Sequence, residues 1–462
     1  MKQTGGRAPA SRPRSSRPRF TPAWLRARLR ALAGPLRGAH FCVAYSGGLD
    51  STVLLAALAS LREHDGFQLR ALHVDHGLHA DSAQWAQGAR AQARRLGIAC
   101  EVLRVRIRRG SGESIEALAR EARYAALAAA LAAREQLITA HTQDDQLETV
   151  LLALSRGGGL RGLSAMGARS KLARRVLLRP LLPVSRAQLA RFAQARKLAW
   201  IEDLTNLDER FDRNYLRLRV LPALRERWPA MAATASRSAA HIAEAQQQLT
   251  RSGRRAAALA ADGAALRVSA LRALDLPARR NLLLYWIAAR GILPPDHRRL
   301  GEIAGPMLEA RPDATPRVQW RGGELRRHGD RLFALTAQES AAQPRPQSWD
   351  WRRNAWLDLG DGSSLGLIAD RHGDVELAKL PARLRIDFRR GGERLQASHG
   401  HLPLKDLLQL HDIAPWRRSA VPLLRRGSRI IAVADLWLAQ ELRAPHSSAG
   451  PRGRLRWRHR FD

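Results

Sequence analysis

The sequence predicts an α/β fold, with a doubly wound parallel sheet in the N-terminal part of the chain and smaller domains after it. Short apolar runs alternate with longer helical patterns between about residues 39 and 203. This alternation is typical of a parallel sheet that helices cover on both faces. Since ligands of such sheets bind beyond the carboxyl ends of the strands, the residues that follow each run are the first candidates for a site.

Four strands and three helices are expected in this region. The apolar runs at residues 41–45, 69–74, 100–107 and 137–140 predict the strands, and the helical patterns at 50–64, 82–96 and 113–134 predict the helices. Each helical pattern lies between two successive runs, which is the order that crossover connections require.

The composition and periodicity of the sequence change twice after this region. Beyond Leu221 and Pro222, an Ala-, Gln- and Arg-rich helical pattern runs to about Arg290 and predicts a helical domain. Strand-like segments around one helix-like segment at 402–411 predict a small α+β domain near the end of the chain. The expected division is a disordered basic arm at 1–22, a first domain at 23–225, the helical domain at 226–336, a polar linker at 337–350 and a C-terminal domain at 351–462.

The charge of the chain indicates a polyanionic partner. Lysine and arginine number 78 against 42 acidic residues, which gives a formal net charge of +36. So large an excess destabilises a compact chain by self-repulsion unless a polyanion neutralises it, so nucleic acid is favoured over a membrane surface. No apolar run approaches the roughly 18 residues of a membrane-spanning helix. The basic start is interpreted as an arm, with an organelle transit peptide as the less favoured alternative.

The two cysteines argue against a metal or iron–sulfur cluster. Cys42 and Cys100 lie far apart in predicted strands and form no CxxC motif. Their small number fits a protein of the reducing cytoplasm.

The stretch SGGLDS, residues 46–51, predicts an anion-binding loop. A strand ends at Tyr45, the two glycines can adopt positive φ, and a helix begins near Asp50. Backbone N–H groups, the helix N-terminus and the hydroxyls of Ser46 and Ser51 would face an anion. The lysine of the common GxxxxGK[ST] loop is absent, and an acid beside phosphates implies Mg²⁺ between them. The alternative is a tight turn with Asp50 as the helix N-cap.

Two further segments contain groups of polar residues. The stretch HVDHGLHADS contains His73, Asp75, His76 and His79 at a strand end, without a recognised metal-binding spacing. The helical stretch ESIEALAREARY places Glu116, Arg120 and Arg123 on one face, which would equally suit an exposed ion-paired surface.

An acidic cluster follows the strand that ends near His141. Asp144, Asp145 and Glu148 fall in the first turns of the next helix, where the helix dipole favours acids as simple caps. Three carboxylates at the rim of a nucleotide site would also suit a cationic substrate, whose amine must be held before it attacks.

Basic residues recur at two later places. The element RNYLR contains Arg213, Asn214 and Arg217, and the two arginines can reach one anion or simply form a solvated helix face. Near the C-terminus, basic residues alternate with Pro415 and Trp416, a mixture suited to phosphate and stacking contacts or to packing beneath a wet surface. These basic residues are Arg389, Arg390, Arg394, Lys405, Arg417 and Arg418.

Together these motifs resemble the N-type ATP pyrophosphatases, or PP-loop superfamily, and within it the tRNA(Ile)-lysidine synthetase family. SGGLDS resembles the pyrophosphate-binding loop of the superfamily. The E-x-x-A-R-x-x-R-Y order, the acidic cluster, SRGGGLRGLSAM at 155–166 and the long stretch at 179–224 resemble the synthetases. The resemblance covers about residues 40–225 and recurs in the last hundred residues, while the middle matches in texture only. Thr205 stands where the family pattern leads us to expect a serine before Asn206.

The resemblance implies a fold, an activity and partners. The first domain would be a Rossmann-like catalytic domain of the adenine-nucleotide alpha hydrolase type, and the two later domains would bind tRNA. The enzyme would use ATP and Mg²⁺ to adenylate the C2 carbonyl of the wobble cytidine in tRNA(Ile) with a CAU anticodon, releasing pyrophosphate. Free lysine would then displace AMP to give lysidine, which changes decoding from AUG to AUA. A cytoplasmic location is implied, and no membrane or protein partner is expected.

The resemblance also assigns roles to individual residues. ATP would bind Ser46, Gly47, Gly48, Leu49, Asp50, Ser51, Val74, Asp75 and His76, with Mg²⁺ at Asp50. Catalysis is assigned to Asp50, Asp144 and Arg120, and lysine binding to Asp144, Asp145 and Glu148. Phosphate or tRNA contacts are assigned to Arg213, Asn214, Arg217, Arg389, Arg390, Lys405, Trp416 and Arg417.

Two rival functions share some of these features. A tRNA sulfur transferase would have the same loop but needs reactive or cluster-binding cysteines, for which Cys42 and Cys100 have no suitable spacing. A non-catalytic RNA-binding protein would explain the charge but not an intact loop beside three acids. A ligase for small molecules is disfavoured by the net charge of +36.

Overall fold

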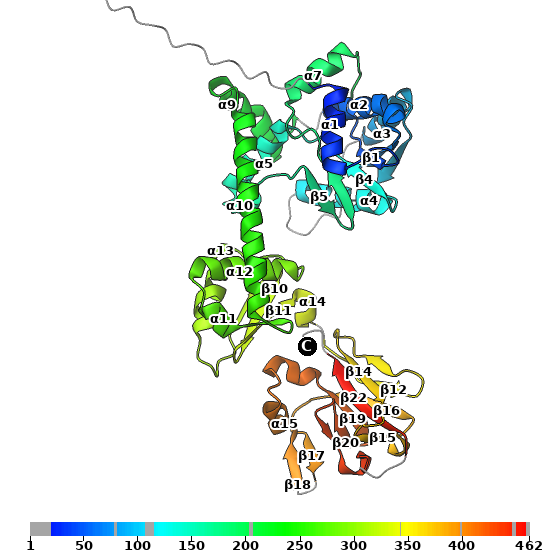
Figure 1. Ribbon diagram of the computed structural model, residues 1–462, viewed down its shortest axis with the longest axis vertical. Coiled ribbons are helices and arrows are strands. Elements are labelled where there is room, and N and C mark those ends of the chain that lie inside the picture. The colour runs from blue at the N-terminus through cyan, green and yellow to red at the C-terminus, as the bar shows by residue number, and fades with distance from the viewer. Residues whose placement is uncertain are drawn as a thin grey trace, which may run out of the picture. The chain divides into compact units, whose positions relative to one another are not determined.

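The computed structural model describes residues 20–77, 81–106, 115–202, 207–341, 343–397, 400–445 and 450–458. The chain forms two compact units that divide after Gln247. Both are drawn in Figure 1, and helix α10 (Met231–Ala260) contains the point of division. In the described ranges, no helix is long and apolar enough to cross a bilayer. The predicted arm lies outside these ranges, except for residues 20–22.

The first unit is built on one six-stranded sheet. Its strands are β1 (His40–Ala44), β2 (Gln68–Asp75), β3 (Cys100–Arg104), β4 (Glu135–Ile138), β5 (Arg169–Leu172) and β6 (Arg175–Leu178). The order is β3-β2-β1-β4-β6-β5, in which only the edge strand β5 runs antiparallel. Because the order reverses at β1, the carboxyl ends of β1 and β4 form the switch point where such sheets bind ligands.

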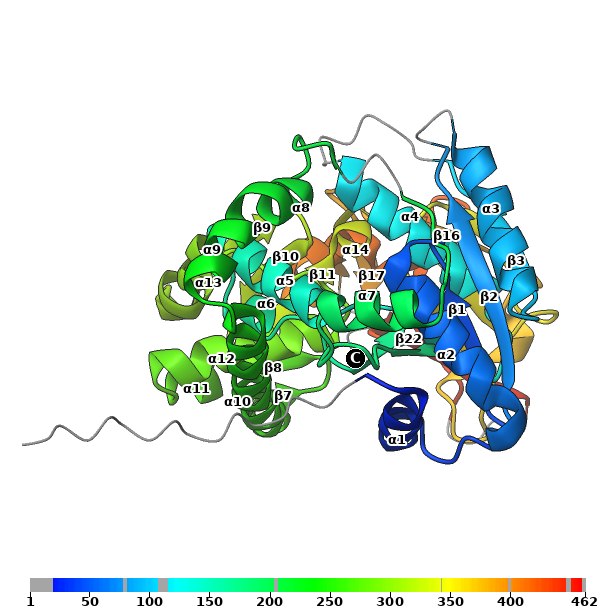
Figure 2. The same ribbon diagram turned by 90° about the horizontal axis from the view of Figure 1, so that it is seen from above.

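Helices cover both faces of this sheet. The helices of the first unit before α10 are α1 (Pro22–Ala33), α2 (Leu49–Asp65), α3 (Ser82–Arg95), α4 (Ile115–Ala130), α5 (Gln143–Ser155), α6 (Leu160–Leu163), α7 (Arg186–Ala195), α8 (Asp212–Tyr215) and α9 (Leu221–Arg227), of which α1, α2, α3, α4 and α7 pack on the sheet. Alternate residues of β1 point to opposite faces. Phe41 and Val43 share a core with α1, α2, α3 and α7, whereas Cys42 packs with residues of α4. Figure 2 shows α1 beside α2.

The observed sheet confirms the predicted fold class and all four predicted strands. Each predicted strand overlaps an observed one, although the third ends at Arg104 instead of residue 107. Strands β5 and β6 were not predicted. Strand β5 (RSKL) has a single apolar residue, and the apolar run of β6 (RVLL) is only three residues long, so neither gives a clear strand pattern.

The middle of the chain is helical only in part, which corrects the expectation of a helical domain. After α10 come α11 (Val268–Arg272), α12 (Leu276–Ala289) and α13 (His297–Glu302). A five-stranded sheet follows the order β7-β8-β11-β10-β9. Its strands are β7 (Ala261–Asp262), β8 (Ala265–Arg267), β9 (Arg317–Trp320), β10 (Gly323–His328) and β11 (Arg331–Thr336).

The charge of β10 explains why the sequence did not predict this sheet. Glu324 is fully buried in β10, and its two oxygens pair with Arg317 and Arg326 at 2.5 and 2.6 Å. A strand with a charged residue at a buried position does not alternate between apolar and polar residues. The two-residue period by which strands are recognised is therefore absent from its sequence.

The C-terminal part is an α+β structure, as predicted. Its strands are β12 (Gln347–Asp350), β13 (Trp356–Asp358), β14 (Ser364–Ala369), β15 (Val375–Glu376), β16 (Arg383–Phe388), β17 (Arg394–Ala397), β18 (Gly400–Pro403), β19 (Pro422–Arg426), β20 (Arg429–Val433), β21 (Trp437–Leu438) and β22 (Arg452–Arg458). Helix α15 (Leu404–Leu410) matches the predicted helical segment. Two sheets, β12-β16-β19-β20-β21 and β13-β14-β22-β15, share one core.

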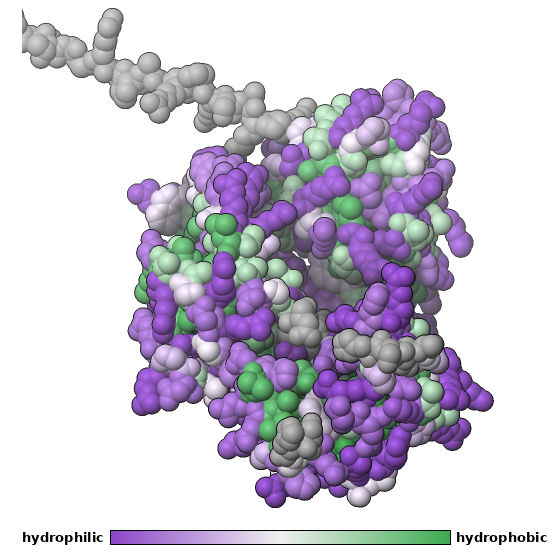
Figure 3. Space-filling view, turned by 60° about the horizontal axis from the view of Figure 1, so that its bottom comes forward, coloured by the Kyte–Doolittle hydropathy of each residue, from purple (hydrophilic) through white to green (hydrophobic). Residues whose placement is uncertain are grey.

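The expected linker is more ordered than its composition indicated. Helix α14 (Ala337–Ala341) begins it and β12 ends it. Trp349 of β12 is buried in the C-terminal core, which supplies the tertiary contact that a polar, proline-containing sequence does not reveal. On the face drawn in Figure 3, hydrophilic residues cover most of the surface and hydrophobic ones form separate patches.

Candidate active site

The loop between β1 and α2 is shaped by close packing. Gly47 has a φ of 83°, and a Cβ there would lie 2.8 Å from Cδ1 of Ile201. The backbone N–H of Ile201 donates to the carbonyl oxygen of Gly47 at 2.9 Å. Only glycine satisfies both the left-handed φ and the lack of space at this position.

The N-terminus of α2 has no side-chain cap. Its N-cap residue is Gly48, so the alternative interpretation of Asp50 as the N-cap is wrong. The hydroxyl of Ser46 lies 3.0 Å from that of Ser51 and accepts from the Gly48 N–H at 3.3 Å. Since the first N–H groups of a helix lack partners within it, a 17-residue helix that begins this way offers an anion both donors and the dipole.

Asp50 lies in the first turn of α2, and its carboxylate lacks hydrogen-bond partners in the described part of the chain. Its Oδ1 is buried and has no hydrogen-bond partner among the described residues, and its Oδ2 lies 3.9 Å from Nε of Arg186. Burial raises the pKa of Asp50 to about 6. An unsatisfied carboxylate oxygen beside a phosphate loop fits a Mg²⁺ ion held by one carboxylate and substrate phosphates. Within the described ranges, no group of three histidine, cysteine or acidic side chains is placed for a metal.

The helix α5 begins with a capping box that uses Asp145. Thr142 donates to Oδ2 of Asp145 from its backbone N–H at 2.7 Å and from its hydroxyl at 2.8 Å. The other oxygen of Asp145 lies 3.6 Å from Nη2 of Arg217. Although burial opposes ionisation, nearby His141 and the Thr142 hydrogen bonds hold the pKa of Asp145 below its usual value. Asp145 is therefore both a cap and a member of the charged site.

Glu148 forms the most buried ion pair of the acidic cluster. Its side chain is 1% exposed, and Arg217 donates to it through two parallel hydrogen bonds, of 2.9 and 3.0 Å. Burial raises the pKa of Glu148, while the Arg217 guanidinium opposes that shift. Arg217 comes from a π-helical turn, Leu216–Val220, a form that is common at functional sites.

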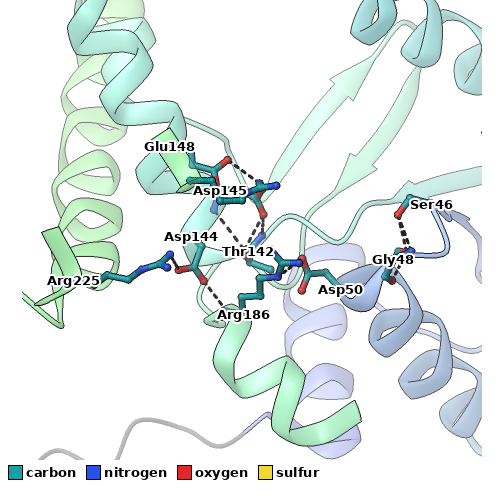
Figure 4. A network of polar contacts seen from close by, with 11 residues as sticks. Ser46, Gly48, Asp50, Thr142, Asp144, Asp145, Glu148, Arg186 and Arg225 are labelled. Carbon is teal, nitrogen blue, oxygen red and sulfur yellow. Dashed lines mark hydrogen bonds and ion pairs between the residues drawn. The ribbon is translucent and has the colours of Figure 1, made fainter. Parts of the chain in front are cut away.

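Asp144 joins the acidic cluster to the phosphate loop. Its Oδ2 accepts the backbone N–H of Arg186 at 2.7 Å, and its Oδ1 accepts Nη2 of Arg225 at 2.6 Å. Figure 4 shows Arg186 between Asp144 and Asp50. Because one residue contacts both carboxylates, the loop of β1 and the acids of α5 belong to one site.

The end of β2 contributes the second predicted nucleotide-lining segment, which includes Val74. Asp75 accepts the backbone N–H of Gly77 at 2.9 Å, and the Nδ1 of His76 is buried with no hydrogen-bond partner in the described part of the chain. Burial, with Arg123 nearby, lowers the pKa of His76 to about 4. His73 Nδ1 lies 3.0 Å from the Tyr45 carbonyl oxygen, so its ring links β2 to β1. His79 lies outside the described residues.

Arg120 and Arg123 of α4 lie over the ring of Tyr124, with guanidinium carbons 5.2 and 5.8 Å from its centroid. The pKa of His141, at the end of β4, is lowered by burial and also by the positive charges of these two arginines. The helix thus carries positive charge toward the edge of the sheet where the loop lies. The side chain of Glu116 is outside the described part of the structure.

The residues of the RNYLR element have different surroundings: Asn214 holds the local backbone, whereas Arg217 belongs to the charged site. Asn214 is buried and donates to the carbonyl oxygen of Asp208 at 3.0 Å, and Arg213 is half-buried in α8. The guanidinium group of Arg217 is paired with the carboxylates of Asp145 and Glu148. Thr205 and Asn206 lie outside the described residues.

The basic residues expected to contact tRNA in the C-terminal part have varied surroundings. Lys405 is exposed, and Arg390 lies 3.6 Å from Asp387. Arg389 is 4.0 Å from Glu393. The ring of Trp416 packs edge-on against Phe333, with Arg326 over its face. Arg417 lies over the ring of Trp457 at 5.5 Å.

Sequence reasoning missed three residues that shape the site: Arg186, Ile201 and Arg225. Arg186 had a signal, because Ser185 and Gln188 form a capping box that marks the start of α7 and exposes the following N–H groups. Ile201 and Arg225 reach the site only through tertiary contacts, and no local pattern marks them.

Comparison with known proteins identifies the family. A PP-loop domain model matches residues 23–224, a TilS substrate binding domain model matches 266–333, and a TilS substrate C-terminal domain model matches 384–457. The tRNA(Ile)-lysidine synthase of Alkalilimnicola ehrlichii is 42% identical over 92% of this chain and 96% of its own length. Those of Coxiella burnetii and Pseudomonas aeruginosa are 39% and 40% identical, over 92% and 88% of this chain and 94% and 92% of their own lengths. The chain belongs to the tRNA(Ile)-lysidine synthase family.

Proposed function

We propose that this chain is an ATP-dependent ligase that converts the wobble cytidine of tRNA(Ile) with a CAU anticodon to lysidine. The observation that carries the proposal is the contact of Arg186 with both Asp50 of the phosphate loop and Asp144 of the acidic cluster. It supports a site where a nucleotide and a cationic substrate lie side by side, in a chain with the domain matches of this family.

In the first half-reaction the phosphate loop binds ATP. The N–H groups at the start of α2 and the hydroxyls of Ser46 and Ser51 hold the departing pyrophosphate, whose charge grows in the transition state. The C2 carbonyl oxygen of the cytidine attacks the α-phosphorus, and the bond to pyrophosphate breaks. A Mg²⁺ ion fits the unsatisfied oxygen of Asp50 and would neutralise phosphate charge there. We assign Arg120 and the end of β2, at Val74, Asp75 and His76, to the same nucleotide.

In the second half-reaction the acidic cluster positions lysine. Asp144, Asp145 and Glu148 hold the side-chain amine near the activated carbon, so that proximity and orientation lower the barrier. Lysine binds as the ε-ammonium and gives one proton to solvent or to a carboxylate of the cluster; the resulting amine attacks C2, and AMP leaves with the former carbonyl oxygen. Since these acids also contact arginines, lysine joins an existing charge network instead of entering an empty acidic pocket.

The remaining domains bind the tRNA in this proposal. The catalytic domain is assigned to 23–225, and the domains at 226–336 and 351–462 contact the tRNA body. Arg213, Asn214 and Arg217 are assigned to the tRNA end of the catalytic site. In the C-terminal domain the assigned residues are Arg389, Arg390, Lys405, Trp416 and Arg417. Binding would depend strongly on salt because most contacts go to phosphates. ATP and tRNA as substrates imply a cytoplasmic location.

A sulfur transferase is disfavoured by the state of the cysteines. Burial raises the pKa of Cys42 to about 12 and that of Cys100 to about 11, so neither is a thiolate at neutral pH. Both are free thiols, on strands β1 and β3 with β2 between them, and they form no cluster motif.

The proposal is tested by incubating the protein with ATP, Mg²⁺, labelled lysine and tRNA with a CAU anticodon. We expect label to enter tRNA(Ile) and not the methionine tRNA that has the same anticodon. An absence of label, or equal labelling of both tRNAs, would overturn the assignment. Asp50→Ala should abolish pyrophosphate release while tRNA binding, measured by filter retention, stays near that of the unmodified protein. A loss of tRNA binding in this variant would instead indicate a structural role for Asp50.

A further inference from the structure

The carboxylate of Asp144 already has a charged partner where the proposed function requires it to receive lysine. One of its oxygens accepts from the backbone of Arg186 at 2.7 Å, and the other accepts from the Arg225 guanidinium at 2.6 Å. The side chain of Asp144 is only 14% exposed. A lysine ammonium that approaches Asp144 therefore meets a cation of the same charge at bonding distance from the same carboxylate.

The arginines of the site differ in how readily they can leave. Arg217 makes two parallel hydrogen bonds with Glu148, whose side chain is 1% exposed. Arg186 contacts Asp144 through its backbone, which is fixed by the start of α7. Within the described part of the chain Arg225 makes one ion pair, through one hydrogen bond; its side chain is 43% exposed, and it lies on the short helix α9. Of the two residues that donate to Asp144, only Arg225 does so through its side chain, so it can leave Asp144 for solvent without a shift of the backbone.

Although the carboxylates of the network outnumber its guanidinium groups by one, both oxygens of Asp144 are already in use, so the local surroundings of Asp144 favour an exchange of cations. Contacts shorter than about 4 Å join four carboxylates, Asp50, Asp144, Asp145 and Glu148, to three guanidinium groups, Arg186, Arg217 and Arg225. If lysine entered with all three arginines in place, Asp144 would carry two cations side by side. If lysine replaces Arg225, the charge around Asp144 stays constant and the guanidinium regains its hydration.

We propose that Arg225 is a displaceable counter-ion of the lysine site, which pairs with Asp144 until the ε-ammonium of lysine takes its place. The inference rests on the proposed lysine-binding role of Asp144. Arg225 is a positioning residue: it keeps Asp144 oriented and lowers the apparent affinity for lysine, because each binding event must break the Arg225–Asp144 pair. It thereby discriminates against weakly bound cations.

The test compares Arg225→Met with Arg227→Met. Arg227 lies on the same helix two residues away, is exposed and has no ion pair in the described part of the chain. Since exposed ion pairs contribute up to about 1 kcal/mol, we expect Arg225→Met to lower the KM for lysine by about two- to fivefold. The KM for ATP should not change in either variant, and Arg227→Met should keep the original KM for lysine. Arg225→Lys, which keeps a cation, should stay close to the unmodified protein.

A second readout uses methylguanidinium as a competitor of lysine. In Arg225→Met the partner position on Asp144 is vacant, so methylguanidinium should inhibit competitively with lysine and more strongly than in the unmodified protein. Arg225→Gln provides the same comparison if the methionine variant folds poorly. An unchanged or higher KM for lysine, without greater sensitivity to methylguanidinium, would overturn the inference. Failure of the unmodified protein to use lysine at all would overturn the proposed function instead, so the two failures are distinguishable.

Discussion

The phosphate loop and the acid-bearing helix meet at one site but are held by different forces. The loop depends on shape: Gly47 has a left-handed φ, and Ile201 packs where its side chain would be. The helix α5 depends on charge: each of its three acids contacts an arginine. A site made by backbone geometry keeps its form in the absence of ligand, whereas a site made by ion pairs can exchange one cation for another.

The largest expected effect comes from Gly47→Ala, which adds a Cβ that the conformation of the loop does not accommodate. The left-handed φ costs about 1–2 kcal/mol for a residue with a Cβ, and the overlap with Ile201 adds about 1–3 kcal/mol. We expect pyrophosphate release to fall roughly 30-fold or more, measured with ATP at fixed tRNA. Ile201→Val removes the overlapping Cδ1, so the double variant should recover part of the loss.

Gly66→Ala is the matched control for backbone strain. Gly66 ends the same helix with a φ of 65°, and a Cβ there would meet no atom closer than 3.5 Å. It should reduce stability without a comparable loss of pyrophosphate release. If the two alanine variants lost activity equally, the loop would not owe its function to its own shape.

A smaller effect is expected from Glu148→Gln, which removes one negative charge from the acidic cluster. The change leaves Arg217 without its closest charged partner, and hydrogen bonds to charged groups contribute about 1.5–3 kcal/mol. We expect a loss of that size in the free energy of unfolding and a higher KM for lysine, with the KM for ATP little changed. Glu121→Gln, at an exposed position of α4, should change neither quantity. A KM for ATP that rose as much as that for lysine would contradict the division of roles.

The smallest effect concerns pH and the neutral histidine beside the loop. Because burial lowers the pKa of His76 from 6.5 to about 4, the unfolded chain binds its proton more readily between those values. His76 therefore contributes stability that is fully present above pH 6.5 and is lost as the pH falls toward 4. His76→Asn should flatten, but not abolish, the fall in unfolding free energy over that window, since burial also lowers the pKa of His73 and His141. An identical pH profile would show that His76 is not buried as a neutral ring.

Much of the site could be predicted because its signals are local. The loop follows a strand of apolar residues and opens a helix, so its glycines, serines and Asp50 were recognised from consecutive letters. The acids of α5 were recognised for the same reason, as were the residues at the end of β2. The sequence could not decide whether these acids cap the helix or belong to a binding site, because that depends on tertiary contacts. Asp145 does both: it caps the helix and contacts Arg217.

The parts that were missed lack the local pattern by which a strand or a helix start is recognised. The sheet at β9–β11 contains the buried ion pairs of Glu324, whose charges hide the strand pattern. The start of α2 shows that Gly48, and not Asp50, is the N-cap, because the turn at Gly47 brings the chain into the helix two residues earlier than a cap at Asp50 would.

The sequence by itself determined four strands of the first sheet with the three helices between them, the position of the phosphate loop and the identity of the three acids. These follow from periodicity and from motifs of a few neighbouring residues. Only the tertiary structure decided which cations neutralise the acids, since Arg186 and Arg225 lie 42 and 81 residues from Asp144. An ion pair depends on distance in space, and a linear sequence carries no measure of that distance until the chain is folded.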